Sequence, residues 1–276
     1  MVRIIGTLIV IALLAAGCSK GGSSSGASGK RLFTSLADFS GMKIASETGS
    51  IFPLFIDRVI PNVEHVSYVS LADIVLALLD DRVDAISLDM HVALYLAARD
   101  SCLAVFPFVV AEDSYGFAVP KGSALGVVGN EALAHLRESG IIGELEKQWF
   151  SADESVKALP DLRHRPDFDG SAGTIRYGSH NTLIPMAYAT LEGAPVGFDL
   201  DIVHRIAYEL NMNVAVSDIL LFGELLPALA AGEIDMAGGS MSITEERLEE
   251  VDFIGPYFEG GTTLVVKRNR VGVQRK

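Results

Sequence analysis

The segment Ser240-Met-Ser-Ile-Thr-Glu-Glu-Arg247 brings two serines, one threonine and one arginine close together in the sequence. Thr244 can cap a helix whose first turn contains Arg247. The Arg247 guanidinium can then bind a carboxylate through two parallel hydrogen bonds, beside the free N–H groups of the helix start. Ser240 and Ser242 alternate on the preceding segment, so both hydroxyls can donate hydrogen bonds. This pattern favours a carboxylate-binding site; the alternative is a surface arginine that pairs with a neighbouring glutamate.

Asp89 is a second candidate binding residue, because it directly follows the apolar strand predicted at 83–88. Ligands of open α/β sheets bind at the carboxyl ends of the strands. The alternative is an aspartate that caps the next helix.

Composition excludes several classes of protein. Of 276 residues, 49% are hydrophobic and 21% are charged, which excludes general disorder. The formal net charge of −13 argues against a nucleic-acid partner, which requires a basic surface. The sequence contains no CxxC, HExxH or GxxxxGK[ST] motif, so we expect no metal site and no cofactor.

The N-terminus has the pattern of an export signal. Arg3 precedes an apolar run at 4–16, which is too short to span a membrane and suits a signal peptide at 1–17. The run ends in Leu14-Ala-Ala-Gly-Cys18, which resembles a bacterial lipobox and predicts a lipidated Cys18; the alternative is an ordinary cleaved signal. The Gly/Ser-rich stretch at 18–33 predicts a flexible tether. Cys102 is then expected to be a buried free thiol.

Helical and strand patterns alternate through the rest of the chain. Similar helix–turn–strand units occur at 71–85 and 222–236, which indicates two α/β lobes with a cleft between them. Strands are expected at 42–45, 83–88, 115–120, 174–177, 214–216, 234–237 and 263–266, and helices at 70–79, 131–150 with a break near 139–140, 197–210 and 222–231.

Short sequence strings in both halves of the chain carry a family resemblance. The C-terminal half resembles the first lobe (lobe 1) of family 3 extracellular solute-binding proteins, the amino-acid-binding components of ABC importers. The N-terminal half resembles the second lobe (lobe 2) and the closing helices. The strings are Gly197-Phe-Asp-Leu-Asp201, Phe222-Gly-Glu-Leu-Leu-Pro-Ala-Leu229, Gly232-Glu-Ile-Asp235 and Ser240–Arg247 in one half, and Thr48-Gly-Ser50, Arg82-Val-Asp-Ala85, Asp89, Tyr115-Gly-Phe-Ala-Val119 and Glu146-Lys-Gln-Trp-Phe150 in the other.

The resemblance implies an α/β fold of the two-lobed type II periplasmic-binding-protein kind, with a mostly parallel sheet in each lobe. It implies that Arg247 binds the carboxylate of an amino acid and that Asp89 binds its ammonium group. Thr48 and Ser50 would complete the carboxylate site from lobe 2. Phe222 would pack on the ligand's side chain, or else would be a core residue.

Three residues depart from the family pattern. Leu183 stands where many members have a stacking aromatic residue. His180 matches a position that often selects the ligand's side chain, and Glu47 enters the same neighbourhood from lobe 2. We expect Glu47 and His180 to line the side-chain end of the pocket and to favour a polar or cationic side chain.

The order of the lobes differs from that of the family. Lobe 2 is assigned to 34–113 and lobe 1 to 114–150 together with 174–267, with a linker at 151–173 and a tail at 268–276. This order predicts a circular permutation; the alternative is a truncated tandem of two units.

A permuted chain has two geometric requirements. Phe33 must lie close to Lys267, and the helices at 131–150 must pack on the segment 174–266.

The favoured hypothesis is a lipid-anchored binding protein on the periplasmic or extracellular face. It is not an enzyme, and it delivers an amino acid, or a related small polar solute, to an ABC permease. One alternative is a periplasmic enzyme on the same scaffold, of the prephenate or arogenate dehydratase kind, in which Glu47 and His180 would act as acid and base. Another is a ligand-sensing module.

Overall fold

The computed structural model describes residues 32–151, 153–159, 167–180, 182–217 and 221–272. The predicted signal peptide, Cys18 and nearly all of the predicted tether lie outside the described residues. None of the helices in the described part combines the length and hydropathy needed to cross a membrane.

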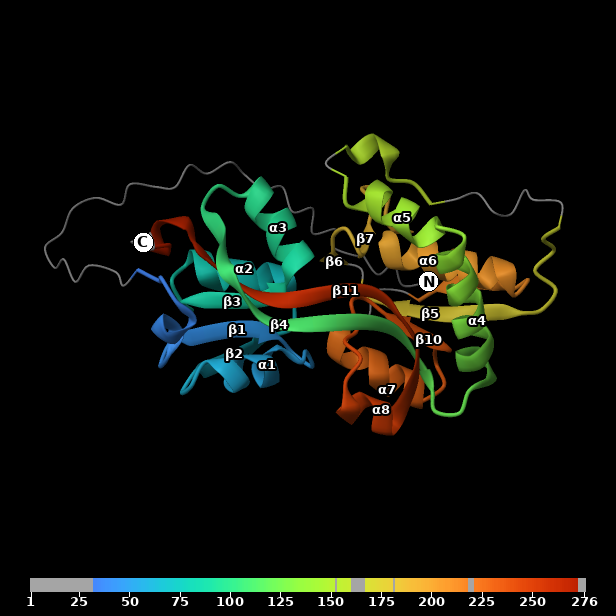
Figure 1. Ribbon diagram of the computed structural model, residues 1–276, viewed down its shortest axis with the longest axis horizontal. Helices are drawn as coiled ribbons and strands as arrows, with labels where there is room; N and C mark the ends of the chain where they lie inside the picture. The colour runs from blue at the N-terminus through green and yellow to red at the C-terminus, as the bar shows by residue number, and fades with distance from the viewer. Residues whose placement is uncertain (1–31, 152, 160–166, 181, 218–220, 273–276) are drawn as a thin grey trace, which may run out of the picture.

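Two α/β lobes share one eight-stranded sheet (Figure 1), because two long strands run through both. These strands, β4 (Leu103–Pro120) and β11 (Val251–Lys267), pair antiparallel along nearly their whole length. The strand order is β2-β1-β3-β11-β4-β10-β5-β9. The sequence predicted only one end of each long strand.

Lobe 2 places three parallel strands beside β11, in the order β2-β1-β3. Ser70 caps α2 as predicted, because its hydroxyl accepts a 3.1 Å hydrogen bond from the Asp73 N–H. Three further elements, α1, β2 and α3, were not predicted. The elements are η1 (Leu36–Phe39), β1 (Lys43–Glu47), α1 (Phe52–Val59), β2 (Glu64–Tyr68), α2 (Leu71–Leu79), β3 (Ala85–Asp89) and α3 (Met90–Arg99).

Lobe 1 contains the parallel strands β10, β5 and β9, so the prediction of mostly parallel sheets is confirmed outside the crossing strands. A small antiparallel sheet, β6-β7-β8, adds to this lobe. The elements are α4 (Ala124–Glu138), α5 (Ile141–Trp149), η2 (Glu154–Val156), β5 (Thr174–Ser179), β6 (Thr182–Leu183), β7 (Ala187–Ala189), β8 (Pro195–Val196), α6 (Phe198–Glu209), β9 (Asn213–Val216), η3 (Phe222–Glu224), α7 (Leu225–Ala230), β10 (Met236–Gly238) and α8 (Glu245–Glu250).

Helix α5 docks on α6, as the predicted lobe order requires. Leu145 and Trp149 are buried in the core. The Trp149 indole Nε1 donates a 3.0 Å hydrogen bond to Asp201 Oδ2 on α6, and Arg205 Nε donates a 2.8 Å bond to the other oxygen. The buried indole therefore has the polar partner that it needs.

The two ends of the described chain lie side by side (Figure 1). Phe33 pairs with Val271; its N–H donates to the carbonyl of Arg270 at 2.7 Å, and its carbonyl accepts from the Gly272 N–H at 2.8 Å. Arg270 belongs to η4 (Arg268–Arg270), which directly follows Lys267. Both geometric requirements of the permuted order are therefore met.

The sequence-based boundary between the lobes is wrong at one point. Residues 262–265 of β11 pair with β3, so the end of the predicted lobe 1 range, 174–267, lies in lobe 2. The start of the predicted tail belongs there too, because it pairs with Phe33.

The expectation for Cys102 is also wrong. Cys102 is half-buried and disulfide-bonded, so it is not a buried free thiol. It follows Ser101 in the turn before β4, outside the apolar interior of the lobe.

Candidate functional site

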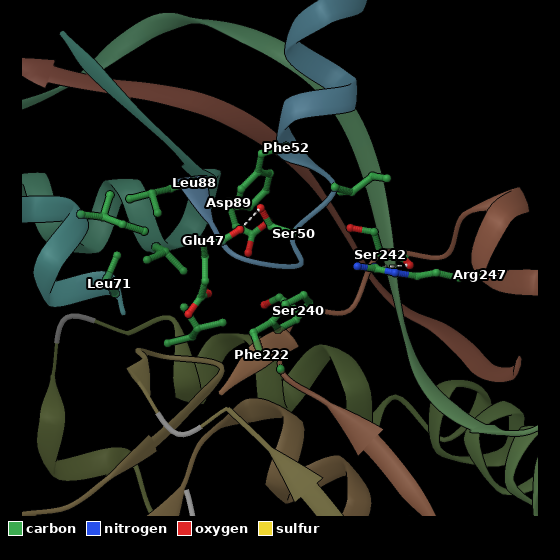
Figure 2. Close-up of a pocket in the computed structure, with 15 residues that line it drawn as sticks. Glu47, Ser50, Phe52, Leu71, Leu88, Asp89, Phe222, Ser240, Ser242 and Arg247 are labelled. Carbon is green, nitrogen blue, oxygen red and sulfur yellow. Dashed lines mark hydrogen bonds between the residues drawn. The ribbon is translucent and has the colours of Figure 1, made fainter. Parts of the chain in front are cut away.

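A small cavity lies between the two lobes (Figure 2). Its volume is about 20 Å³, which leaves room for about one water molecule. Seven of the nine predicted ligand residues line it: Glu47, Ser50, Asp89, Phe222, Ser240, Ser242 and Arg247. The other lining residues are Ile51, Phe52, Leu71, Ile74, Leu88, Val92, Leu183 and Gly239.

Arg247 enters the cavity from the first turn of α8. The predicted cap is present, because the Arg247 N–H donates to Thr244 Oγ1 at 3.2 Å. The side chain is only 9% exposed, and its guanidinium donates to two backbone carbonyls, that of Ser242 at 2.9 Å and that of Gly49 in lobe 2 at 3.3 Å. The alternative of a surface arginine paired with a glutamate is therefore wrong.

Asp113 is a site residue that the sequence analysis missed. It lies on β4, and its Oδ2 accepts a 2.5 Å hydrogen bond from the Ser242 hydroxyl. Burial raises the pKa of Asp113, while this hydrogen bond and the charge of Arg247 oppose the rise. Asp113 thus supplies a negative charge close to the buried guanidinium. The signal in the sequence is the acidic pair at 112–113, which interrupts an apolar run.

Asp89 lies at the end of β3, as predicted, and is nearly fully buried. Its Oδ1 accepts a 2.7 Å hydrogen bond from the Tyr115 hydroxyl, and its side chain makes no capping bond to α3. The capping alternative is therefore wrong. Burial raises the pKa of Asp89 to about 8; the charges of Asp113 and Asp199 add to the rise, and the hydrogen bond from Tyr115 and the charge of Arg247 oppose it.

Ser240 is held in the cavity wall by a fully buried carboxylate. Asp199, in the first turn of α6, accepts hydrogen bonds from the N–H groups of Gly239 at 2.9 Å and Ser240 at 3.2 Å. Ser240 has a φ of 54°, a left-handed conformation that is uncommon for a serine. Its hydroxyl lies 3.3 Å from Nε2 of His91, on α3 in lobe 2.

Glu47 lines the cavity at the end of β1, but His180 does not. His180 lies behind Glu47, with its Nε2 3.1 Å from Glu47 Oε1 and 2.9 Å from the Thr182 hydroxyl. Burial raises the pKa of Glu47 to about 8, with a further rise from Asp89, and burial lowers the pKa of His180 to about 4. Near neutral pH, the imidazole is therefore uncharged.

The two hydroxyls of the 48–50 turn are directed to carbonyl groups. Thr48 is exposed and lies outside the cavity, and its Oγ1 donates to the carbonyl of Tyr68 at 3.1 Å. Ser50 lines the cavity, and its hydroxyl donates to the carbonyl of Glu47 at 2.7 Å. Phe222 forms part of the wall, with its ring 5.7 Å from the Arg247 guanidinium carbon.

Comparison with known proteins agrees with this architecture. Residues 175–273 match the profile of the bacterial extracellular solute-binding proteins, family 3. Over this segment, about a third of its length, the chain is similar to family 3 of the bacterial extracellular solute-binding proteins. The polar cavity residues of lobe 1, Ser240, Ser242 and Arg247, fall within the matched range. Glu47 and Asp89 of the cavity, and Asp113 beside Ser242, lie outside it.

Individual relatives match this chain over part of their length. A histidine-binding periplasmic protein of Salmonella typhimurium is 33% identical over 34% of this chain and 36% of the relative. A glutamine-binding protein of a Bacillus subtilis ABC transporter is 40% identical over 49% of this chain and 46% of the relative. Among solved structures, an ancestral arginine-binding protein bound to arginine is 41% identical over 31% of this chain and 38% of that chain, with a TM-score of 0.30. The chain therefore spans only about a third to a half of the length of these curated relatives.

The described residues contain no group of three or more histidine, cysteine, aspartate or glutamate side chains arranged to hold a metal ion. The chemistry available in the cavity is thus that of hydrogen bonds and charges. Lobe 1 supplies the guanidinium of Arg247 and the hydroxyls of Ser240 and Ser242, and lobe 2 supplies the hydroxyl of Ser50 and the carboxyl groups of Glu47 and Asp89.

Proposed function

We propose that this chain binds an α-amino acid between its lobes and delivers it to an ABC importer, without chemical turnover. The observation that carries the proposal is that Arg247 of lobe 1 and Asp89 of lobe 2 line one closed cavity. An α-amino acid carries a carboxylate and an ammonium group at a fixed separation. A site that recognises both groups needs one cation and one anion, each held rigidly.

The hydrogen bonds of Arg247 support a role in binding. Its guanidinium donates to the carbonyls of Ser242 and Gly49, which are neutral acceptors. A ligand carboxylate is a stronger acceptor than a carbonyl, because it carries a negative charge and because its two oxygens can accept two parallel hydrogen bonds from a guanidinium. The ligand carboxylate can therefore replace the carbonyl of Gly49, which belongs to the opposite lobe.

Entry of a ligand requires the lobes to separate. A volume of about 20 Å³ does not admit an amino acid. The lobes are connected through β4 and β11, and a hinge motion can take place where these strands cross from one lobe to the other. Opening and closing about this hinge would let the chain present its ligand to a permease.

A thermal-shift screen of the twenty common amino acids tests this function. A ligand at 100 times its Kd stabilises the folded chain by about 2.7 kcal/mol, which raises the melting temperature measurably. We expect one chemical class of amino acid to do so, and prephenate to be neither bound nor converted. If no amino acid raises the melting temperature at millimolar concentration, the proposed function is wrong.

We also propose that Cys18 carries the lipid that anchors the chain to a membrane, with 19–33 as its tether. The chain has two cysteines and Cys102 is disulfide-bonded in the structure, so a lipid on the Cys18 sulfur requires that an intramolecular disulfide be absent from the mature protein. Mass spectrometry of protein extracted from membranes separates the two outcomes. Lipid on a peptide that begins at Cys18 supports the anchor, and a Cys18–Cys102 disulfide refutes it.

The lobe order supports a permuted family fold. A chain that begins at residue 174, joins residue 272 to residue 32 through a short linker and ends at residue 150 restores the family order. We expect this variant to be a monomer with the ligand affinity of the native chain. If light scattering shows that the native chain is a dimer, exchange of segments between two truncated units becomes the better account.

A further inference from the structure

The cavity has a charged end and an apolar end, and Glu47 lies at the apolar one. Glu47, Asp89 and Arg247 line the same cavity, and Figure 2 shows Asp89 between the other two. An amino acid held by Arg247 and Asp89 therefore directs its side chain towards Glu47.

Glu47 is buried without a compensating charge. It is only 9% exposed, and among the described residues its Oε1 has no hydrogen-bond partner. The nearest basic group, His180 Nε2 at 3.1 Å, lacks the geometry of a hydrogen bond and belongs to an uncharged imidazole. The apolar side chains that line the same cavity include Leu71, Ile74 and Leu183. A carboxyl group buried in such surroundings is stable either in its protonated form or as a carboxylate that is paired with a cation.

We infer that Glu47 selects the ligand and that it selects an amino acid with a positively charged side chain, a specificity that rests on the proposed function. A guanidinium, ammonium or imidazolium group would supply the missing counter-ion to Glu47. A neutral side chain leaves the carboxyl protonated, and an acidic side chain places two carboxyl groups together. Affinity therefore follows the order cationic, neutral, acidic.

Binding of a cation at this position is coupled to the release of a proton. The groups that face Glu47 are Asp89 from β3 and His180 from the segment after β5, with Arg247 of α8 acting on Asp89. Burial and Asp89 raise the pKa of Glu47 to about 8, so at neutral pH its carboxyl holds a proton when no cation is near. A cationic side chain displaces this proton to the solvent, whereas a neutral one leaves it in place.

L-arginine and L-citrulline form a matched pair of probes, because they have nearly the same shape and differ by one positive charge. Isothermal titration calorimetry on the full chain should show that arginine binds at least about tenfold more tightly than citrulline. The Glu47→Gln variant should lose this preference. Raising the pH from 6.5 to 8.5 should strengthen arginine binding more than citrulline binding. Titrations in two buffers should detect more proton release with arginine than with citrulline, because the ammonium group of either ligand displaces a proton from Asp89 and only the arginine side chain displaces one from Glu47.

Several outcomes overturn the inference. Equal affinities of citrulline and arginine for the native chain overturn it. An undiminished preference for arginine in a Glu47→Gln chain that unfolds at the native temperature also overturns it. If a neutral amino acid binds and arginine does not, the charge selection is wrong while the proposed function stands. If no amino acid binds, the proposed function fails and the selection fails with it.

Discussion

The backbones of Gly49 and Gly223 touch across the boundary between the lobes. A Cβ atom at Gly49 would lie 2.8 Å from the Gly223 Cα, and a Cβ atom at Gly223 would lie 3.2 Å from the Thr48 carbonyl oxygen. Gly49 also has a φ of 83°, a conformation that residues with side chains seldom adopt. The absence of two side chains therefore permits the closed arrangement, in which Arg247 reaches the carbonyl of Gly49.

Gly223→Ala should weaken ligand binding while leaving each lobe folded. The added methyl group presses on the Thr48 carbonyl only when the lobes are closed, so it penalises the closed state. We expect a loss of affinity of about tenfold or less by calorimetry, with an unchanged far-ultraviolet circular dichroism spectrum. Gly143→Ala is the control, because a Cβ atom there meets no neighbouring atom. Equal affinities for both variants would contradict the assignment of this contact to closure.

Arg247→Lys should bind the amino acid found by thermal shift at least about tenfold more weakly than the native chain, because an ammonium group cannot form two parallel hydrogen bonds to a carboxylate. Arg247→Ala should lose more, about 2–5 kcal/mol, because Asp113 and the ligand carboxylate then lack their cation. Arg268→Ala serves as a control, since the Arg268 side chain bonds to the Ser101 carbonyl, away from the cavity. An Arg247→Ala chain with native affinity would show that Arg247 does not bind the ligand.

Asp201→Ala should destabilise the chain without altering the cavity walls. The substitution leaves the buried indole N–H of Trp149 without its acceptor and Arg205 without its ion-pair partner. An unsatisfied buried donor costs about 1–3 kcal/mol, to which the lost ion pair adds. Urea denaturation should show the loss, whereas Asp153→Ala, at an exposed residue, should unfold as the native chain does. Native stability in Asp201→Ala would mean that α5 is held by its apolar face alone.

The stability of the unliganded chain should depend on pH in two opposite ways. Glu47 and Asp89 have folded-state pKa values of about 8, above their unfolded values near 4, so stability falls as the pH rises between these limits. His91 has a folded-state pKa of about 3, below its unfolded value near 6.5, so stability falls as the pH drops below about 6.5. Because two carboxyl groups outweigh one imidazole between about pH 4 and 6.5, we expect the melting temperature to fall as the pH rises from about 5 to 8, and to fall more steeply above 6.5.

The Glu47→Gln variant isolates the alkaline part of this dependence. It removes one of the buried carboxyl groups that ionise at high pH, so its melting temperature should fall less than that of the native chain between pH 6.5 and 8.5. An identical fall in both chains would indicate that Glu47 ionises without cost in the folded state.

Local patterns in the sequence were reliable guides to single elements and to residues that line the cavity. The caps at Ser70 and Thr244, the strand end at Asp89 and the break in the helix before Ile141 all depend on neighbouring residues, and the structure confirms each. The positions of Arg247 and Asp89 in one cavity also follow from these local patterns together with the family resemblance.

Features set by distant parts of the chain were not predictable in this way. The long strand β4 was recognised only at 115–120, because Pro107 and the acidic pair at 112–113 interrupt its apolar pattern. The pairing with β11 accommodates these residues, and no short-range pattern reveals it. The same holds for Asp113, which becomes a site residue only when Ser242 folds against it, and for His180, which the packing of lobe 1 places behind Glu47.

The shared strand pair has a consequence for the biosynthesis of the chain. The sheet of lobe 2 needs β11 beside β3, and β11 lies near the C-terminal end of the described chain. A ribosome makes the residues of lobe 2 early but supplies this last strand late, so the nascent lobe keeps an unpaired strand edge during most of translation. Folding of both lobes must therefore wait for the same late segment, and we expect the newly made chain to need protection from aggregation until that segment is released.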